Sequence, residues 1–221
     1  MNKETVRSIV EKVVQELTFL TKEEKPTIPV AVSARHIHLS QQDVEVLFGT
    51  GYELTQKAEL SQPGQFAANE TVTIAGTKGS IRNVRVLGPA RGRTQIEISQ
   101  TDAISLGYRP PVRQSGDIRE SSPCTVIGPK GALTIPEGLI IAQRHIHMTP
   151  ADAEQLAVKD GDYVSVSIKS ERPVTFEDVL IRVNERYKLE MHIDTDEANS
   201  ALVQKGQTGK LVLKQEGGNH E

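Results

Sequence analysis

Two copies of a short histidine motif are the residues best suited to chemistry. Arg35-His-Ile-His38 recurs as Arg144-His-Ile-His147, displaced by 109 positions. In an extended segment, residues two apart point to the same side, about 6.5–7 Å from each other along the chain. Both imidazoles of each pair can therefore reach one cavity, and we predict a functional site at each copy.

A second repeat supplies a further candidate ligand for each pair. Glu97-Ile-Ser-Gln-Thr-Asp-Ala103 resembles His192-Ile-Asp-Thr-Asp-Glu-Ala198, displaced by 95 positions. The predicted ligand sets are His36, His38 and Glu97 in one half and His145, His147 and His192 in the other. Three nitrogen or oxygen ligands with an open fourth position are typical of catalytic zinc. The same ligands also suit Co, Ni, Fe or Mn.

The histidine pairs fit a metal site of this kind better than a packing role or a different class of metalloprotein. Single histidines are usually surface or packing residues, but four of the six in this chain fall in the repeated motif. A double cupin also carries His-x-His in a β-barrel, with a Glu a few residues later. Here Glu45 and Glu154 fall on the polar face of a short predicted helix. Metallo-hydrolases of the His-x-His-x-Asp-His type need a run that this sequence lacks.

A basic segment lies just ahead of Glu97. Gly88-Pro89 predicts a turn, which would place Arg91 at a bend facing the cavity that Glu97 enters. A guanidinium beside a dication binds the oxygens of phosphate or carboxylate well. A solvated charged turn is the alternative for Arg91 and for Arg93.

Each histidine pair is predicted to lie where a strand is followed by a helix. Ser40 precedes Asp43 by three positions, as Thr149 precedes Asp152, and this spacing resembles a capping box. Pro150 occupies the favoured first helical position. We therefore predict short helices near residues 40–48 and 149–157.

The rest of the chain is rich in short β segments separated by Gly-containing turns, which favours small barrels or sandwiches. The offsets of 109 and 95 fit two homologous halves that differ by a loop of 14 residues. We predict one half over residues 28–120 and the other over 121–213. Residues 1–20 have the pattern of an amphipathic helix, residues 21–27 of a linker, and residues 214–221 of a flexible tail. The helix is expected to pack on its own domain, to dock on a partner or to form a dimer contact.

Composition limits the function further. The chain has 221 residues, a formal net charge of −3, 4% aromatic residues and no Trp, which disfavours nucleic-acid binding. The single cysteine, Cys124, cannot form an intramolecular disulfide and has no neighbouring His to activate it. No apolar run is long enough to span a membrane, and no secretory signal is present. We expect a cytoplasmic protein with neither nucleic-acid nor membrane partners.

The chain resembles one family over residues 28–213, the phosphotransacylases of the propanediol-utilisation type, also called phosphate propanoyltransferases. The motifs that carry the resemblance are Val32-Ser-Ala-Arg-His-Ile-His38, Gln62-Pro-Gly-Gln-Phe-Ala67, Gly88-Pro-Ala-Arg91, Gln95-Ile-Glu97, Gln143-Arg-His-Ile-His147 and Met191-His-Ile-Asp-Thr-Asp-Glu-Ala-Asn199. The resemblance implies a mainly β fold of two small barrels capped by short helices. It also implies that the first strand, around Pro29 to Ser33, is exchanged into the other barrel.

The resemblance assigns roles to individual residues. Two divalent metal ions, usually Zn²⁺, map onto the two ligand sets above, and the catalytic, phosphate-binding arginine maps onto Arg91. Coenzyme A contacts map onto Val32, Ser33, Ala34, Lys78, Arg85 and Asn199.

The activity implied is acyl transfer between coenzyme A and inorganic phosphate, with propanoyl-CoA or acetyl-CoA as the acyl donor. A role in propanediol degradation and a location inside a bacterial microcompartment follow from the same resemblance, with residues 1–20 as the segment that meets the shell. A homodimer is a further expectation. The alternatives are a metal-dependent hydrolase, which would use water in place of phosphate, and a non-catalytic metal-binding scaffold.

Overall fold

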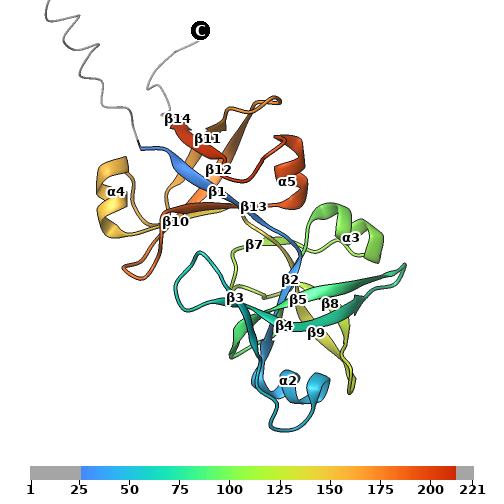
Figure 1. Ribbon diagram of the computed structural model, residues 1–221. Coiled ribbons are helices and arrows are strands. Elements are labelled where there is room, and N and C mark those ends of the chain that lie inside the picture. Colours follow the sequence, from blue (N-terminus) through green and yellow to red (C-terminus); the bar gives the residue numbers. More distant parts are fainter. Residues whose placement is uncertain (1–25, 213–221) are drawn as a thin grey trace, which may run out of the picture.

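The computed structural model describes residues 26–212, and these form two β-barrels (Figure 1). The predicted N-terminal helix, most of the predicted linker and the predicted tail, with His220, lie outside the described residues. No helix among residues 26–212 is long and apolar enough to cross a membrane.

The first barrel contains most strands of the N-terminal half. Its strands are β2 (His36–Ser40), β3 (Gln56–Glu59), β4 (Phe66–Ala75), β5 (Ser80–Arg91), β6 (Gln95–Glu97), β7 (Val112–Arg113), β8 (Ser122–Ile127) and β9 (Ala132–Ala142). The sheet runs β3-β4-β5-β2-β6-β9-β7. Because β8 pairs with both β4 and β9, six of these strands close into a ring.

The second barrel is closed in the order β1-β13-β10-β12-β11-β14. Its strands are β1 (Ile28–Ser33), β10 (His145–Met148), β11 (Tyr163–Ile168), β12 (Val174–Val183), β13 (Glu190–Asp194) and β14 (Thr208–Val212). β1 runs parallel to β13 and antiparallel to β14, although it precedes the first barrel in the chain. The predicted fold class of two small barrels is confirmed.

Strand pairing does not follow the division predicted at residue 120. β8 and β9 follow that position, yet they pair with β4 and β6 of the first barrel. The chain passes between barrels at Ala34–Arg35 and again at Gln143–Arg144. The repeat offsets located the two homologous halves, but they carried no information about which barrel the intervening strands would join.

Each barrel buries its own apolar core. One cluster includes Ile37, Val72, Val84, Val86, Ile96 and Leu139, and the other includes Ile28, Ile146, Val166, Val179, Ile181 and Ile193. The alternation along β4 and β5 places these side chains inside and polar ones outside. Ile37 and Ile146 are fully buried, and each is the residue between the two histidines of a pair. The histidines must therefore face out of the barrel core.

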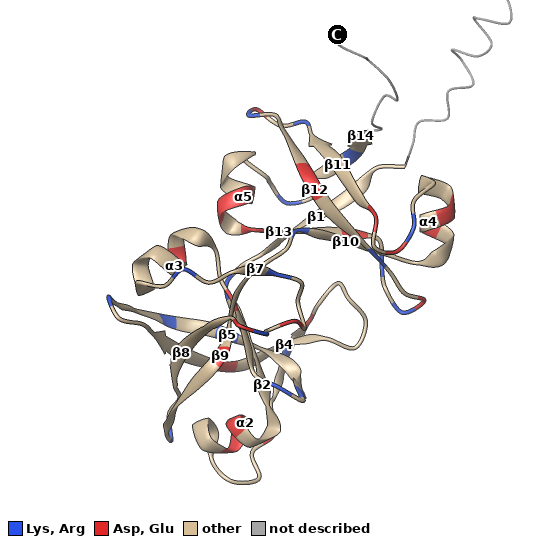
Figure 2. Cartoon of the chain, turned by 180° about the vertical axis from the view of Figure 1, so that it is seen from behind, with Lys and Arg blue, Asp and Glu red and all other residues tan. Residues whose placement is uncertain are grey.

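Four short helices each follow one of the strands that carry candidate ligands. These are α2 (Gln41–Phe48), α3 (Gln100–Leu106), α4 (Pro150–Leu156) and α5 (Thr195–Ser200). α2 and α4 were predicted, and α3 and α5 extend the pattern to the strands of Glu97 and His192. All four helices have acidic residues in the first turn and no basic residue in the last, which suits the helix dipole at the N-terminal end (Figure 2).

The predicted caps form, with one difference between the two copies. Ser40 and Thr149 each accept a hydrogen bond from the backbone N–H three residues later. Asp152 completes a capping box with Thr149. The carboxylate of Asp43 instead accepts a hydrogen bond from Thr94, a residue of the first barrel.

The turn predicted at Gly88-Pro89 is not a chain reversal. Both residues lie inside β5 and are joined by a cis peptide bond. Pro89 has no N–H to donate to the sheet, and the register between β2 and β5 shifts here, from His38 opposite Leu87 to Ser40 opposite Arg91. A Cβ at position 88 would lie 2.2 Å from Cζ of Phe66, so the ring of Phe66 packs directly on the glycine.

Candidate metal centre and active site

Strand pairing brings the three predicted ligands of each half together. In the first barrel His36 of β2 lies opposite Glu97 of β6 in antiparallel register. In the second barrel His145 of β10 lies opposite His192 of β13 in the same way. The second histidine of each pair is two residues further along its strand and shares that face.

The resulting groups have the dimensions of metal sites. One ligand atom from each of His36, His38 and Glu97 lies within 4.8 Å of the others, and the same holds for His145, His147 and His192. Within residues 26–212 these are the two clusters of three or more such side chains. They coincide with the two predicted ligand sets. Nε2 of His36 is 3.5 Å from Oε2 of Glu97.

The backbone orients the first histidine of each pair. Nδ1 of His36 is 2.9 Å from the Ala34 carbonyl oxygen, and Nδ1 of His145 is 2.8 Å from the Gln143 carbonyl oxygen. If Nδ1 donates to the carbonyl, Nε2 is left with a lone pair facing the cluster. Ligand-binding histidines commonly have such a partner on the other ring nitrogen.

The second histidine of each pair has a buried nitrogen without a partner. Nδ1 of His38 and Nδ1 of His147 are the buried side-chain nitrogen or oxygen atoms of residues 26–212 that make no hydrogen bond. A buried polar atom left unpaired costs about 1–3 kcal/mol. Each of these two unpaired Nδ1 atoms belongs to a histidine in a cluster of three potential ligands, which fits the binding of a cation.

Most of these imidazoles are held neutral at pH 7. Burial, together with the charge of His36, lowers the pKa of His38 to about 3. Burial also lowers the pKa of His145 to about 4, of His147 to about 2 and of His192 to about 4. Neutral imidazoles are the form that binds metal ions.

His36 and Glu97 are coupled in the opposite sense. Burial lowers the pKa of His36, but the Glu97 carboxylate and the Ala34 carbonyl raise it, and the net pKa lies above the ordinary value. Burial raises the pKa of Glu97, but His36 and the Ser115 hydroxyl lower it well below its usual range. The three candidate ligands of the first cluster therefore include a carboxylate, whereas those of the second are all imidazoles, with Oε2 of Glu190 3.3 Å from Nε2 of His192.

Two residues fix the orientation of Glu97. Its Oε1 accepts hydrogen bonds from Nε2 of Gln95 at 2.6 Å and from Oγ of Ser115 at 2.7 Å. Oε1 of Gln95 in turn accepts from the N–H of Gly116 at 2.7 Å. Oε2 of Glu97 is thus left to face His36. Sequence reasoning missed Ser115, which lies 18 positions from Glu97 in a loop without periodic pattern.

The arginine ahead of each histidine pair contacts the helix that follows the third ligand. Nε of Arg35 lies 2.8 Å from Oδ2 of Asp102 in α3, and Nη1 of Arg144 lies 2.8 Å from Oε1 of Glu197 in α5. These equivalent ion pairs tie the segment entering each His-x-His to the helix that continues from Glu97 or His192. The repeated Arg is therefore part of the framework of the site.

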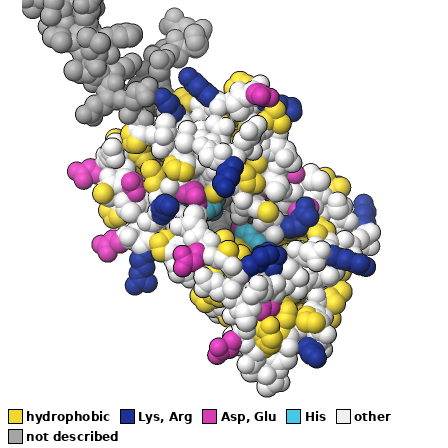
Figure 3. All heavy atoms as spheres, in the orientation of Figure 1, with side chains coloured by type: hydrophobic (Ala, Val, Ile, Leu, Met, Phe, Trp, Pro, Cys, Tyr) yellow, Lys and Arg dark blue, Asp and Glu magenta, His cyan; other side chains and the backbone are white. Residues whose placement is uncertain are grey.

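Both clusters line one cavity of about 560 Å³ between the barrels. Arg91, Arg182 and Tyr187 also line it, together with Ser115, Gln62 and the apolar side chains of Leu60, Ala67 and Leu87. In the space-filling view, histidine side chains are visible in a hollow bordered by Lys and Arg side chains (Figure 3). The ring of Tyr187 lies 4.1 Å from that of His147, centroid to centroid.

The other residues singled out from the sequence are divided between the cavity and the surface. Val32, Ser33, Ala34 and Arg85 line the cavity. Lys78 and Asn199 are exposed and are not among its lining residues. Arg93 points away from the cavity and pairs with Glu137 on the surface. Cys124 is buried, and burial raises the pKa of its thiol to about 11, which leaves it protonated.

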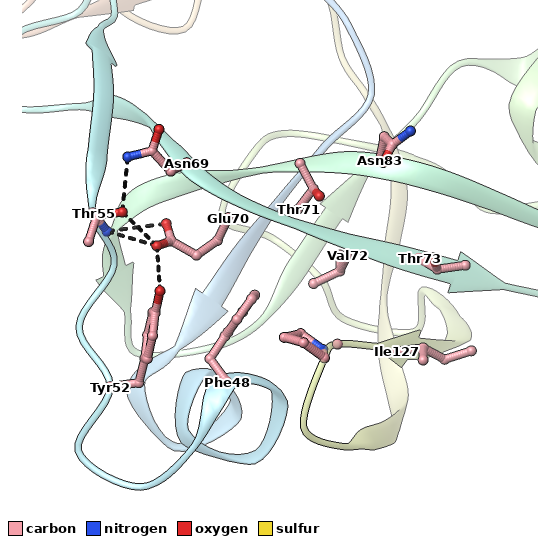
Figure 4. A pocket seen from close by; sticks show the side chains of 12 residues that line it. Phe48, Tyr52, Thr55, Asn69, Glu70, Thr71, Val72, Thr73, Asn83 and Ile127 are labelled. Carbon is pink, nitrogen blue, oxygen red and sulfur yellow. Dashed lines mark hydrogen bonds between the residues drawn. The ribbon is translucent and has the colours of Figure 1, made fainter.

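A second hollow lies on the first barrel, beside α2, and contains none of the candidate ligands (Figure 4). Its one carboxylate, Glu70, accepts hydrogen bonds from the Tyr52 hydroxyl at 2.9 Å and from the Thr55 backbone N–H and hydroxyl. These bonds tie the loop after α2 to β4. The only carboxylate of this hollow is thus bound within the fold, so the cavity between the barrels is the better candidate for an active site.

Comparison with known proteins agrees with this placement of the site. The family model for phosphate propanoyltransferase matches residues 29–204. The chain belongs to this family. A phosphate propanoyltransferase of Priestia megaterium is 62% identical over 98% of this chain and 99% of its own length. One of Thermotoga maritima is 57% identical over 92% of this chain and 95% of its own length.

Membership of the phosphate propanoyltransferase family makes the protein an acyltransferase of the phosphotransacylase type, and the predicted family and enzyme class are confirmed. A phosphate propanoyltransferase of Lachnoclostridium phytofermentans is also 59% identical over 81% of this chain and 84% of its own length. The matched residues include both histidine pairs, Glu97, His192 and the strands that carry them.

Proposed function

We propose that the protein transfers a short-chain acyl group between coenzyme A and inorganic phosphate, in the cavity between the barrels. The observation that carries this is the convergence of both ligand clusters and Arg91 on one cavity. A phosphotransacylase must bring an anion and a thioester together, and a single site that holds both removes much of the entropic barrier.

We propose that each cluster binds one divalent ion, with Zn²⁺ as the best fit to the donors. His36, His38 and Glu97 would hold one, and His145, His147 and His192 the other. The neutral imidazoles, the two unpartnered Nδ1 atoms and the oriented Glu97 carboxylate suit such ions. When bound, the ions would offset the charge of phosphate and polarise the thioester carbonyl.

Arg91 is proposed as the phosphate-binding, catalytic arginine. It ends β5 opposite Ser40 and lines the cavity beside Glu97. Burial lowers its pKa, yet a guanidinium stays protonated at physiological pH. Its planar group can donate two hydrogen bonds to phosphate oxygens and so aim a third oxygen at the acyl carbonyl.

The reaction then needs no covalent enzyme intermediate. A phosphate oxygen forms a bond to the acyl carbon, the bond from that carbon to sulfur breaks, and the phosphate proton is transferred to the departing thiolate. Acyl phosphate and free coenzyme A result. Arg91 holds the attacking phosphate, and its charge lowers the cost of bringing two anionic substrates together.

Coenzyme A is proposed to enter along β1. Val32, Ser33, Ala34 and Arg85 line the cavity, and Lys78 and Asn199 would meet more distant parts of the cofactor. Leu60, Ala67 and Leu87 are apolar residues that line the same cavity and would contact the acyl chain. Propanoyl and acetyl groups differ by one methylene, which such a surface distinguishes by about 1–3 kcal/mol. Both are proposed substrates.

The test is thiol release from propanoyl-CoA by the metal-loaded protein, with and without inorganic phosphate. Release that requires phosphate and stops after chelation is the expected result, and acetyl-CoA in the same assay gives the acyl preference. Release in the absence of phosphate would identify a thioesterase instead. No release from a metal-loaded sample would favour the scaffold alternative.

Two further proposals concern the assembly. We propose that residues 1–20 direct the protein into a bacterial microcompartment that degrades propanediol, and that the chain forms a homodimer. Fusing residues 1–20 to a fluorescent protein should bring it into purified shells, and deleting them should exclude the enzyme. Sedimentation equilibrium of the full chain measures the oligomeric state.

A further inference from the structure

Two guanidinium groups reach the cavity from different barrels. Arg91 comes from β5 of the first barrel, and Arg182 comes from β12 of the second. Arg182 lies opposite His147 in the parallel register between β10 and β12. The repeat-related position in the first barrel is Leu87, opposite His38, so this arginine has no counterpart there.

The other arginines of the cavity already have partners within the fold. Arg35 forms an ion pair with Asp102, and Nη1 of Arg85 donates to the carbonyl oxygens of Ala68 and Asn69 at 2.9 Å each. Within residues 26–212, neither Arg91 nor Arg182 forms a side-chain hydrogen bond or an ion pair. Two sets of guanidinium N–H donors therefore remain for a ligand.

Arg182 lies next to a cluster whose three candidate ligands are all histidines, whereas Arg91 lies near the Glu97 carboxylate. The carboxylate beside the second cluster, Glu190, lies 3.3 Å from Nε2 of His192 and forms no ion pair with Arg182. The two arginines also repel each other: burial lowers the pKa of Arg91, and the charge of Arg182 lowers it too. An anion between two such groups relieves the repulsion and accepts hydrogen bonds from both.

We propose that Arg182 is a second phosphate-binding residue, which contacts the phosphate from the second barrel while Arg91 contacts it from the first. The inference rests on the proposed function, because it deepens the assignment of the same cavity. It makes phosphate a ligand shared by both barrels, with one guanidinium from each. Phosphate, and the phosphoryl group of the acyl phosphate product, would then be bound by two groups that are far apart in the sequence.

Two measurements on metal-loaded Arg182→Gln test the proposal. The first is the dissociation constant of inorganic phosphate by calorimetry, and the second is the KM for phosphate and for propanoyl-CoA. Loss of a charge-assisted hydrogen bond predicts phosphate binding weakened by about 10-fold to 100-fold. The KM for propanoyl-CoA should change by less than about twofold. Arg182→Lys should recover part of the phosphate affinity, because it keeps the charge.

Arg186→Gln is the matched control. It removes the same charge four positions away, from an exposed residue that does not line the cavity. The proposal is overturned if Arg182→Gln binds phosphate as the wild type does, if Arg186→Gln weakens it equally, or if the effect falls on the KM for propanoyl-CoA alone. Metal content and the thermal unfolding midpoint identify a variant that has lost its metals or its fold, in which case Arg182→Lys carries the test.

The design also separates this inference from the proposed function. Calorimetry with phosphate needs no turnover, so Arg182 is tested even if propanoyl-CoA is not the substrate. A wild-type protein that releases coenzyme A only with phosphate, together with an unaffected Arg182→Gln, would leave the proposed function intact and remove only the role of Arg182.

Discussion

Nδ1 of His36 lies 2.9 Å from the carbonyl oxygen of Ala34, and Ala34 belongs to the short segment that carries the chain from β1 of the second barrel to β2 of the first. The same relationship joins His145 to Gln143 at the other passage between barrels. The two connections therefore also orient one histidine of each cluster, because their carbonyl oxygens contact His36 and His145. Changes in the crossing segments should alter metal binding even where no ligand is replaced.

Ser115→Ala should weaken metal binding at the first cluster. The Ser115 hydroxyl donates to Oε1 of Glu97, and loss of such a supporting contact typically costs about 10-fold to 100-fold in metal affinity. Competition with a chelating dye should reveal one weakened site and one unchanged. Ser115→Thr should keep the affinity, and Ser80→Ala, at an exposed position of β5, is the control. Equal weakening of both sites would contradict the prediction.

Arg91→Ala should keep both metal ions and lose most turnover. Removing one preorganised donor to a reacting oxyanion costs about 100-fold to 1,000-fold. Arg93→Ala removes an exposed guanidinium that pairs with Glu137, and it should leave the rate of phosphate-dependent thiol release unchanged. Metal content by elemental analysis accompanies the rates. A fully active Arg91→Ala would refute the role assigned to Arg91.

His36→Ala should lose the metal of the first cluster and retain that of the second, because it removes one of three donors. His145→Ala should do the reverse. Elemental analysis after dialysis against metal-free buffer measures both outcomes. Unchanged metal content in either variant would show that the ligand set contains the wrong residue.

The metal-free protein should lose stability as pH falls from about 6.5 to about 4. The pKa values of His38, His145, His147 and His192 are lowered in the folded state, so between those pH values the unfolded chain binds more protons. Each such histidine contributes at most about 1.4 kcal/mol per pH unit. Above pH 6.5 these four histidines are neutral in both the folded and the unfolded chain, so they cost no stability there. The pKa of His36 is raised in the folded state, so its effect on stability has the opposite sign.

Urea unfolding of chelator-treated protein at pH 7.5 and pH 5 measures this dependence. His147→Gln should reduce it, since one titrating group is removed. A free energy of unfolding equal to or higher at pH 5 than at pH 7.5 would contradict the sign.

Gln62→Ala should loosen the contact between the barrels. The Gln62 side chain donates to the Lys188 carbonyl at 3.1 Å and accepts from the Lys188 N–H at 3.2 Å, although the two residues belong to different barrels. Gln62 is buried but Lys188 is exposed, so each lost hydrogen bond should cost about 0.5–1.5 kcal/mol. Urea unfolding, with Gln56→Ala at an exposed position as the control, should detect the loss. Equal free energies of unfolding for the two variants would show that the contact contributes nothing.

The grouping of these side chains into two clusters was predictable because the internal repeat linked them. Offsets of 109 and 95 aligned the histidine pairs with each other and Glu97 with His192. Antiparallel pairing of their strands then places Glu97 opposite His36 and His192 opposite His145. The two-barrel fold followed from the repeat and the short β segments. The caps of α2 and α4 were visible as short spacings of polar residues.

Other features depended on contacts that leave no local pattern. Arg182 breaks the repeat, because its counterpart is Leu87, so comparing the halves gave no reason to select it. Ser115 lies in the loop between β7 and β8, and no periodic pattern there indicates its hydrogen bond to Glu97. The pairing of β8 and β9 with the first barrel is decided by burial of Cys124, Val126 and Leu139 in that core, which the strand pattern alone did not specify.

The position of β1 also governs when the enzyme can become active during synthesis. This strand leaves the ribosome early, yet its partners β13 and β14 leave late. The second barrel cannot close, and the shared cavity cannot form, until nearly the whole chain has been made. A product terminated before His192 would hold an unpaired N-terminal strand and an incomplete second set of candidate ligands. An active site can therefore form only after the C-terminal strands have been translated.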